Sequence, residues 1–246
     1  MKKMIALLLA LSLLLIMLAG CGSSETGETT AATEATTTAS EETSTQEPTT
    51  EEPTTEEPTT EEPTTADADG LAGTVNGKVY TNTKADFVLT LNDNWYIYSE
   101  AEIAAVIGLT AEVIDDESVS ALVESSGNAM VFYAQEDAGS TINIIWEKVG
   151  LMGIFLTADT YIDSALATVG DGLAASGFTD IFTEKITVSF AGEDRPAIRL
   201  SAAYGGIPIY EIMIPIVCGN YVCVVTLCAL DFEACADLLP NFSPVI

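Results

Sequence analysis

The arrangement of the folded region is decided by residues 208–227, which read PIYEIMIPIVCGNYVCVVTL. Two long apolar runs flank Gly219-Asn220, a pair that favours a two-residue II′ hairpin turn. With that turn, alternate side chains of the two strands share a face, and both faces are largely apolar. Since neither face suits contact with water, we expect an antiparallel sheet that is covered on both sides.

Further strands and helices surround this hairpin. Hydrophobic periodicity and turn residues predict strands over 87–91, 129–134, 141–146, 182–190 and 196–203. Helices are predicted from the Ser99 capping box to Gly108 and over 110–125, 159–176 and 231–239, and Asn76-Gly77 predicts a hairpin. Strands with helices at both ends indicate an α+β domain in which helices cover both faces of the sheet.

The loop between residues 204 and 208 sets the register of a second hairpin. A two-residue turn would place Leu200 opposite Glu211 and bring charge into the core. A three-residue loop over 205–207 places Leu200 opposite Ile212 instead, so we expect that loop. The residues then expected to be buried together beneath one helix are Ile198, Leu200, Ile212, Ile214, Ile216 and Val225.

The first twenty residues have the pattern of an export signal. Lys2 and Lys3 precede an uncharged apolar run over 4–19, which is shorter than the roughly 20 residues that span a bilayer. The run ends in Leu18-Ala19-Gly20-Cys21, which resembles the lipobox of bacterial lipoproteins. An ordinary secretory peptide or a short membrane helix would not need this cysteine. We therefore expect cleavage before Cys21, lipid on its sulfur, and anchoring to the extracytoplasmic face of a bacterial cell membrane.

Residues 21–69 are predicted to form a lipid-anchored, disordered stalk. The stretch after Cys21 is rich in Thr, Glu and Pro and has no aromatic residue and no Leu, Ile, Val or Met. Such a composition cannot bury enough apolar surface to offset the entropy cost of ordering. The stalk would reach about 40 Å as a flexible coil and about 150 Å if it were wholly polyproline-like. A single folded domain is expected over 70–246.

Composition excludes one large class of partner. The chain has 37 acidic residues, eight basic residues and no histidine, which gives a formal net charge of −29. Binding to nucleic acid needs clustered Lys and Arg, so we expect no nucleic-acid partner. The lack of histidine also removes the commonest general base and the commonest zinc ligand.

No motif in the chain predicts catalysis, a metal ion or a cofactor. Asp115-Asp116-Glu117 is best explained as the acidic start of a helix. A pair of glycosidase carboxylates leaves no local motif, so a hydrolase stays open as an alternative. Four cysteines have a spacing that fits neither a zinc nor an iron–sulfur site, and we favour buried free thiols over two disulfides. These cysteines are Cys218, Cys223, Cys228 and Cys235.

The order of the elements resembles the PsbP-like α/β/α sandwich, a fold also found in small bacterial lipoproteins. The residues that carry the resemblance are 87–91 with Trp95, 140–144, 187–193, 205–210 and 219–221. Residues 92–94, Asn-Asp-Asn, replace the proline that the family usually has before its tryptophan. The plant protein that gives the fold its name assists a photosystem by binding to it. The resemblance therefore implies a binding or accessory role and transfers no catalytic residue.

These observations together predict a surface lipoprotein that displays a non-catalytic binding domain on a stalk. Its ligand would be a protein, a glycan or a small molecule. One alternative is a solute-binding lipoprotein of a transporter, which usually has two lobes around a cleft. A cell-wall hydrolase is the second alternative, disfavoured because the sequence shows no catalytic motif.

Overall fold

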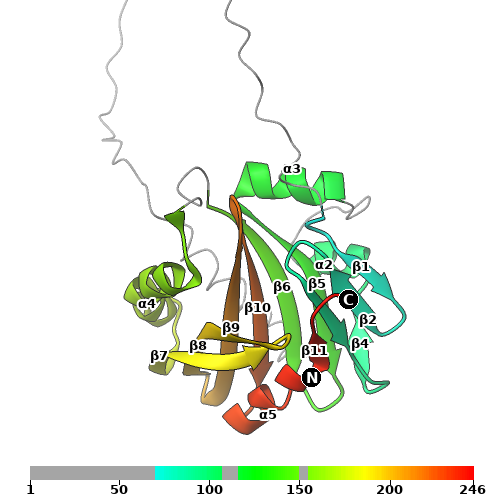
Figure 1. Ribbon diagram of the computed structural model, residues 1–246. Helices are drawn as coiled ribbons and strands as arrows, with labels where there is room; N and C mark the ends of the chain where they lie inside the picture. Colours follow the sequence, from blue (N-terminus) through cyan, green and yellow to red (C-terminus); the bar gives the residue numbers. More distant parts are fainter. Residues whose placement is uncertain (1–69, 107–115, 150–154) are drawn as a thin grey trace, which may run out of the picture. The chain divides into compact units, whose positions relative to one another are not determined.

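The computed structural model describes residues 70–106, 116–149 and 155–246, which form two antiparallel sheets and a few helices (Figure 1). In spatial order the larger sheet comprises β4 (Trp95–Ile97), β5 (Asn128–Glu136), β6 (Thr141–Lys148), β10 (Tyr221–Ala229), β9 (Ile207–Cys218), β8 (Glu193–Tyr204) and β7 (Thr179–Phe190). The smaller sheet comprises β1 (Thr74–Asn76), β2 (Val79–Asn82), β3 (Phe87–Thr90) and β11 (Phe242–Ser243). The predicted signal peptide, Cys21 and stalk lie outside the described residues, as does the beginning of the helix predicted over 110–125.

Short helices and one long helix complete the domain. They are α2 (Glu100–Val106), α3 (Asp116–Ser126), α4 (Ala158–Ala175), α5 (Phe232–Ala236) and the 3-10 turn η3 (Leu239–Asn241). Two of the predicted helix ends are confirmed in detail. At α2 the Glu102 carboxylate accepts a hydrogen bond of 2.8 Å from the Ser99 backbone N–H, as a capping box requires. After α4, Gly177 has a φ of 88°, which suits a glycine beyond a helix C-terminus.

The larger sheet separates two buried layers. On one face α4 packs against β7, β8 and β9, and Ile103 of α2 lies against residues of β5 and β6. On the other face the smaller sheet contributes aromatic side chains to the main core, together with α3 and α5 (Figure 1). The expected mixed fold with antiparallel strands is therefore confirmed. Helical cover of both faces is not confirmed, because a second sheet occupies much of one of them.

The smaller sheet joins segments that are far apart in the chain. Phe242 of β11 pairs with Leu89 of β3, and its ring lies 5.8 Å from that of Phe87 and 4.6 Å from that of Phe190. Burial alternates along β2 and β3, so one side of this sheet is buried and the other faces solvent, as expected for a layer that covers a core.

The hairpin of β9 and β10 has the predicted register. Cys218 pairs with Tyr221, Ile214 pairs with Val225, and Gly219 has a φ of 62°. A positive φ at the first turn position is what a II′ turn requires, so the sequence identified this turn correctly.

The predicted register between β8 and β9 is wrong. Leu200 pairs with Glu211, because Gly205 and Gly206, with φ values of 58° and 82°, form a two-residue turn. Two successive left-handed residues match the twist of a hairpin, and glycine adopts them without strain. Ile198 and Leu200 consequently face α4, whereas Ile212, Ile214, Ile216 and Val225 belong to the core on the opposite face.

The first hairpin also differs by one position. Asn76 pairs with Val79, so the turn comprises Gly77 and Lys78 rather than Asn76 and Gly77. Gly77 carries the positive φ, of 62°. The position of Gly77 in the sequence therefore predicted the turn to within one residue.

Candidate functional site

The residues singled out in the sequence lie in different parts of the domain. Cys21 and Asp115 lie outside the described residues. Asp116 begins α3 and Glu117 is exposed, which agrees with an acidic helix start.

The four cysteines of the domain are free thiols, as expected. Cys218 is partly buried and the other three are buried. The Sγ of Cys235 donates to the backbone oxygen of Tyr210 over 3.1 Å. Burial raises the pKa of the Cys218 thiol to about 11 and that of Cys235 to about 12, and it raises the pKa values of Cys223 and Cys228 well above the ordinary value. Since the thiolate is the nucleophile and the metal ligand, none of the four is prepared for either task.

This inertness predicts slow thiol chemistry. In a Cys21→Ala chain at pH 8, we expect Cys218 to react with a disulfide reagent about a hundredfold more slowly than free cysteine. The three buried thiols should react only after denaturation. Colorimetric thiol titration with and without denaturant measures both. Rapid native reaction of more than one thiol would contradict the burial of these side chains.

A set of polar side chains crosses the α4 face of the larger sheet, on the middle strands. We call it the polar row, and it consists of Glu211 on β9, Thr226 and Cys228 on β10, Thr141 and Asn143 on β6, and Tyr133 on β5. The strand pairing puts these residues beside one another: Glu211 with Cys228, Cys228 with Thr141, Thr226 with Asn143, and Asn143 with Tyr133. Each side chain is at most 2% exposed.

Several atoms of the polar row have no hydrogen-bond partner of ordinary length and angle, although Cys228 lies beside Glu211 and Thr141 beside Tyr133. Across the described residues, nine buried side-chain nitrogen or oxygen atoms are unpartnered, and five of the nine belong to this row. They are both carboxylate oxygens of Glu211, the amide oxygen of Asn143, and the hydroxyls of Thr226 and Tyr133. Native proteins contain few such atoms, and each costs about 1–3 kcal/mol. Their gathering on four adjacent strands marks this part of the interior as the candidate site.

The electrostatics of the row centre on Glu211. Burial raises the pKa of its carboxyl to about 8, and Cys228 beside it lowers that pKa only in part. The thiol of Cys228 is itself kept protonated, chiefly by burial and then by the nearby Glu211. Thr141 lies next in line, because it lowers the pKa of both Cys228 and Tyr133. At neutral pH the row therefore holds a proton on Glu211 unless a positive charge replaces it.

A second buried carboxylate lies on the same face of the sheet. The hydroxyl of Tyr161 on α4 donates to Oε2 of Glu147 over 2.9 Å, and burial raises the pKa of Glu147 to about 7. Glu147 lies beside Val222, six residues along β10 from the position opposite Glu211. The two carboxylates are thus about 20 Å apart along the strands. A glycosidase pair needs about 5–10 Å, so these two do not form one.

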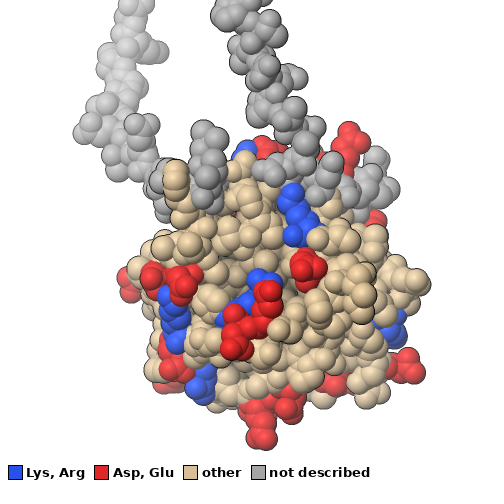
Figure 2. Space-filling view, viewed as in Figure 1, with Lys and Arg blue, Asp and Glu red and all other residues tan. Residues whose placement is uncertain are grey.

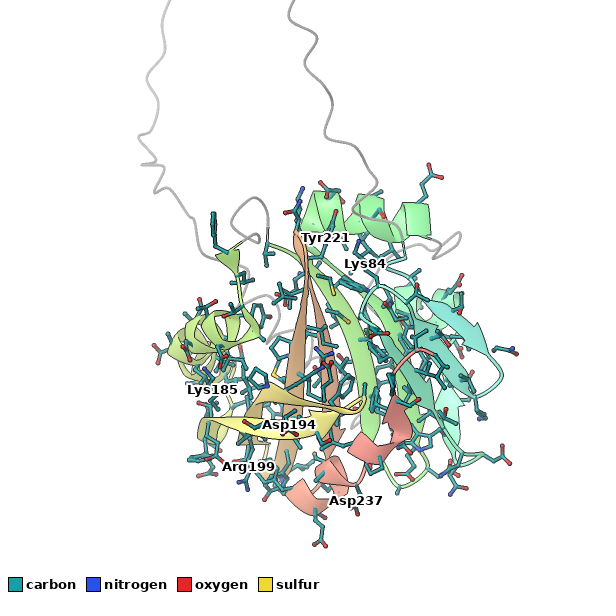
Figure 3. The ribbon with its side chains drawn as sticks, viewed as in Figure 1. Lys84, Lys185, Asp194, Arg199, Tyr221 and Asp237 are labelled. Carbon is teal, nitrogen blue, oxygen red and sulfur yellow. The ribbon has the colours of Figure 1, made fainter. Side chains whose placement is uncertain are left out.

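Basic side chains of the domain are engaged away from the polar row. Lys185 bridges to Asp159 and Asp163 of α4, and Arg199 pairs with Glu184. Lys84 lies 5.6 Å from the ring centre of Tyr221, near α3 (Figure 3). The remaining contacts of basic side chains are Arg195 with Glu193, Lys148 with Glu124, and Lys78 with the backbone oxygen of Trp95.

The visible surface is dominated by uncharged residues. Figure 2 shows Lys and Arg side chains in small groups beside Asp and Glu, with uncharged surface between them. No continuous basic surface is visible on this face.

The described residues contain neither a cluster of metal ligands nor a membrane-crossing helix. No three His, Cys, Asp or Glu side chains in them are grouped so that they would hold a metal ion. Within the same ranges, no helix has the length and hydropathy needed to cross a membrane.

The polar row was missed in the sequence, although a signal for it exists. Tyr133, Asn143 and Thr226 are isolated polar residues within apolar strands, and each faces the same side once the register is known. The sequence analysis considers Glu211, but it expects a three-residue loop at 205–207 because that loop keeps the Glu211 charge out of the core.

Comparison with known proteins shows a similarity to solved structures. No protein-family model matches the chain, and no curated protein matches its sequence. The solution structure of cyanobacterial PsbP (CyanoP) from Synechocystis sp. PCC 6803 is similar, with a TM-score of 0.41 and 12% sequence identity, over 70% of this chain and 98% of that one. At this identity and TM-score the similarity carries no conclusion about family or role.

Proposed function

We propose that this chain is a lipid-anchored lipoprotein that displays a non-catalytic binding domain on the outer side of a bacterial cell membrane. The observation that carries the proposal is Leu18-Ala19-Gly20-Cys21 at the end of an uncharged apolar run. Two acyl chains on the mature cysteine would hold the protein stably, since each buried CH₂ contributes about 0.8 kcal/mol. The Thr/Glu/Pro-rich residues 22–69 would then separate the domain from the lipid surface.

The domain supports a binding role more than a chemical one. Its thiols have raised pKa values, and its two buried carboxylates, Glu147 and Glu211, are too far apart to act as a pair. Its described residues build one seven-stranded sheet with cover on both faces, whereas transporter-linked solute-binding proteins usually close two lobes around a cleft. In this proposal the domain is a variant PsbP-like sandwich, in which the smaller sheet shares one outer layer with α3 and α5.

The proposed lipid anchor is tested by replacing Cys21, whose sulfur would carry the lipid. Cys21→Ala should abolish incorporation of labelled fatty acid and move the protein from the detergent phase to the aqueous phase, or leave uncleaved precursor. Cys218→Ala is the matched control, because it removes another cysteine and should leave labelling unchanged. Fatty-acid labelling of Cys21→Ala equal to that of the unaltered chain would refute the anchor.

The binding role needs a separate experiment. The full chain, cross-linked on intact cells and recovered with its neighbours, should bring down a reproducible partner or glycan. The matched control is the same chain without residues 70–246, which keeps the anchor and the stalk. If both recover the same molecules, the domain is not the binding element.

A further inference from the structure

We propose that the polar row encloses a seat for one small cation, an alkali-metal ion or a primary ammonium group, bound by Glu211 with the neutral oxygens of Thr226 and Asn143. This inference concerns the interior of the domain and is independent of the proposed anchor. It rests on the unpartnered atoms, on their type, and on the positions of the basic residues.

The unpartnered atoms of the row are mostly acceptors. Both oxygens of Glu211 and the amide oxygen of Asn143 accept hydrogen bonds or coordinate cations, and they donate nothing while Glu211 is ionised. The hydroxyls of Thr226 and Tyr133 can each accept as well as donate. A carboxylate repels an anion, so the complementary guest is positively charged. All-oxygen surroundings are those that hard cations prefer.

Among the residues that the structure describes, no basic side chain neutralises Glu211. Outside the leader, the sequence contains six Lys and Arg residues. Five of these are paired with acids or with a backbone oxygen, and Lys84 lies over the Tyr221 ring. The countercharge must therefore come from a proton or from a cation that enters from outside.

A proton alone leaves the row incomplete. A protonated Glu211 is neutral and has one hydrogen to donate, and that hydrogen satisfies neither its second oxygen nor the amide oxygen of Asn143, which lies two strands away. In the proposed seat the cation lies over β10, where Thr226 is directly opposite Asn143 and diagonal to Glu211, so that oxygens from three adjacent strands surround it.

The other titratable groups near Glu211 would not block a cation. They are the thiols of Cys228 on β10 and Cys235 on α5, and both stay protonated. The buried side chains of α4 are Tyr161, Ile162, Ala165, Val169 and Leu173, of which Tyr161 is bonded to Glu147. On α2 the buried side chains are Ile103 and Ala104. Proton and cation therefore compete for one carboxylate.

The test uses the full chain in detergent and measures thermal unfolding at pH 8.5 and constant chloride. The salts compared are potassium, sodium, methylammonium and choline chloride, the last being a bulky quaternary ammonium ion whose nitrogen carries no N–H to donate. We expect one or more of the first three to raise the unfolding midpoint by about 4 °C per tenfold increase above its dissociation constant. Preference for potassium or sodium identifies a metal-ion site, and preference for methylammonium identifies an ammonium site.

Two further readouts make the result specific. Binding at pH 7 should release close to one proton, measured in weakly buffered solution, and release should vanish near pH 9.5. Glu211→Gln should abolish both the midpoint shift and the proton release, whereas Glu147→Gln, which alters the other buried carboxylate, should keep the midpoint shift. Equal midpoints in all four salts, or an unchanged response in Glu211→Gln, would overturn the cation seat and leave the row filled by water or a proton.

Discussion

Replacing Glu211 by glutamine is expected to raise the free energy of unfolding by roughly 4 kcal/mol at pH 8 in choline buffer. The folded state keeps the Glu211 proton up to about pH 8, whereas an unfolded chain loses it near the ordinary value of 4.5. Unfolding therefore releases a proton between these two values, so the stability of the unaltered protein falls as pH rises from about 4.5 to 8 and levels off above that. Glutamine has no proton to lose, so it removes this fall.

Urea unfolding between pH 5 and pH 9 measures the effect. Glu147 contributes a similar fall that ends near pH 7, so the slope between pH 7 and pH 8 belongs mainly to Glu211. Glu233→Gln, at an exposed position on α5, lowers the net negative charge equally and should change stability by less than about 0.5 kcal/mol. A Glu211→Gln protein that is less stable than the unaltered one at pH 8 would show that the carboxyl is stabilised by partners.

Leu200→Asp is expected to abolish cooperative folding at neutral pH. Leu200 is fully buried in the α4 layer and lies directly opposite Glu211 on the neighbouring strand. An aspartate there would be a second buried acid beside the first, and its cost, more than about 4 kcal/mol, is comparable with the whole stability of a small domain. Far-ultraviolet circular dichroism and limited proteolysis measure the loss.

Two controls separate charge from lost volume. Leu200→Ala should fold with a penalty of about 2–5 kcal/mol, because it only leaves a cavity. Thr187→Asp, at an exposed position on β7, should fold normally. A folded Leu200→Asp protein with an intact unfolding transition would mean that Leu200 does not face the α4 layer.

The sequence predicted the register of one hairpin and not of the next, for a physical reason. At Gly219-Asn220 the turn chemistry and the apolar pattern favour the same pairing, so there was no conflict to resolve. At Gly205-Gly206 the turn favoured one register, and the rule that charges avoid the core favoured another. The structure has the register that the two-glycine turn favours, so Glu211 lies in the core. Its carboxyl is buried there with a raised pKa.

Features that depend on contacts between distant segments could not be predicted from local sequence patterns. The two residues of β11 are too few to show periodicity, and their pairing with β3 depends on tertiary packing. The polar row takes single residues from four strands, so it exists only once the register between those strands is known. Local signals did identify the long helix α4, the capping box at Ser99 and the buried thiols, because each depends on neighbouring residues.

The pairing of β11 with β3 has a consequence for the order of events during synthesis. A chain that emerges from its N-terminus exposes β2 and β3 long before Phe242 is available to complete their sheet. Contacts between such distant segments form slowly, because a long loop must close first. Until then Phe87 and Leu89 lack part of their cover. Final closure waits for the last strand, which ties completion of the domain to release of the whole polypeptide.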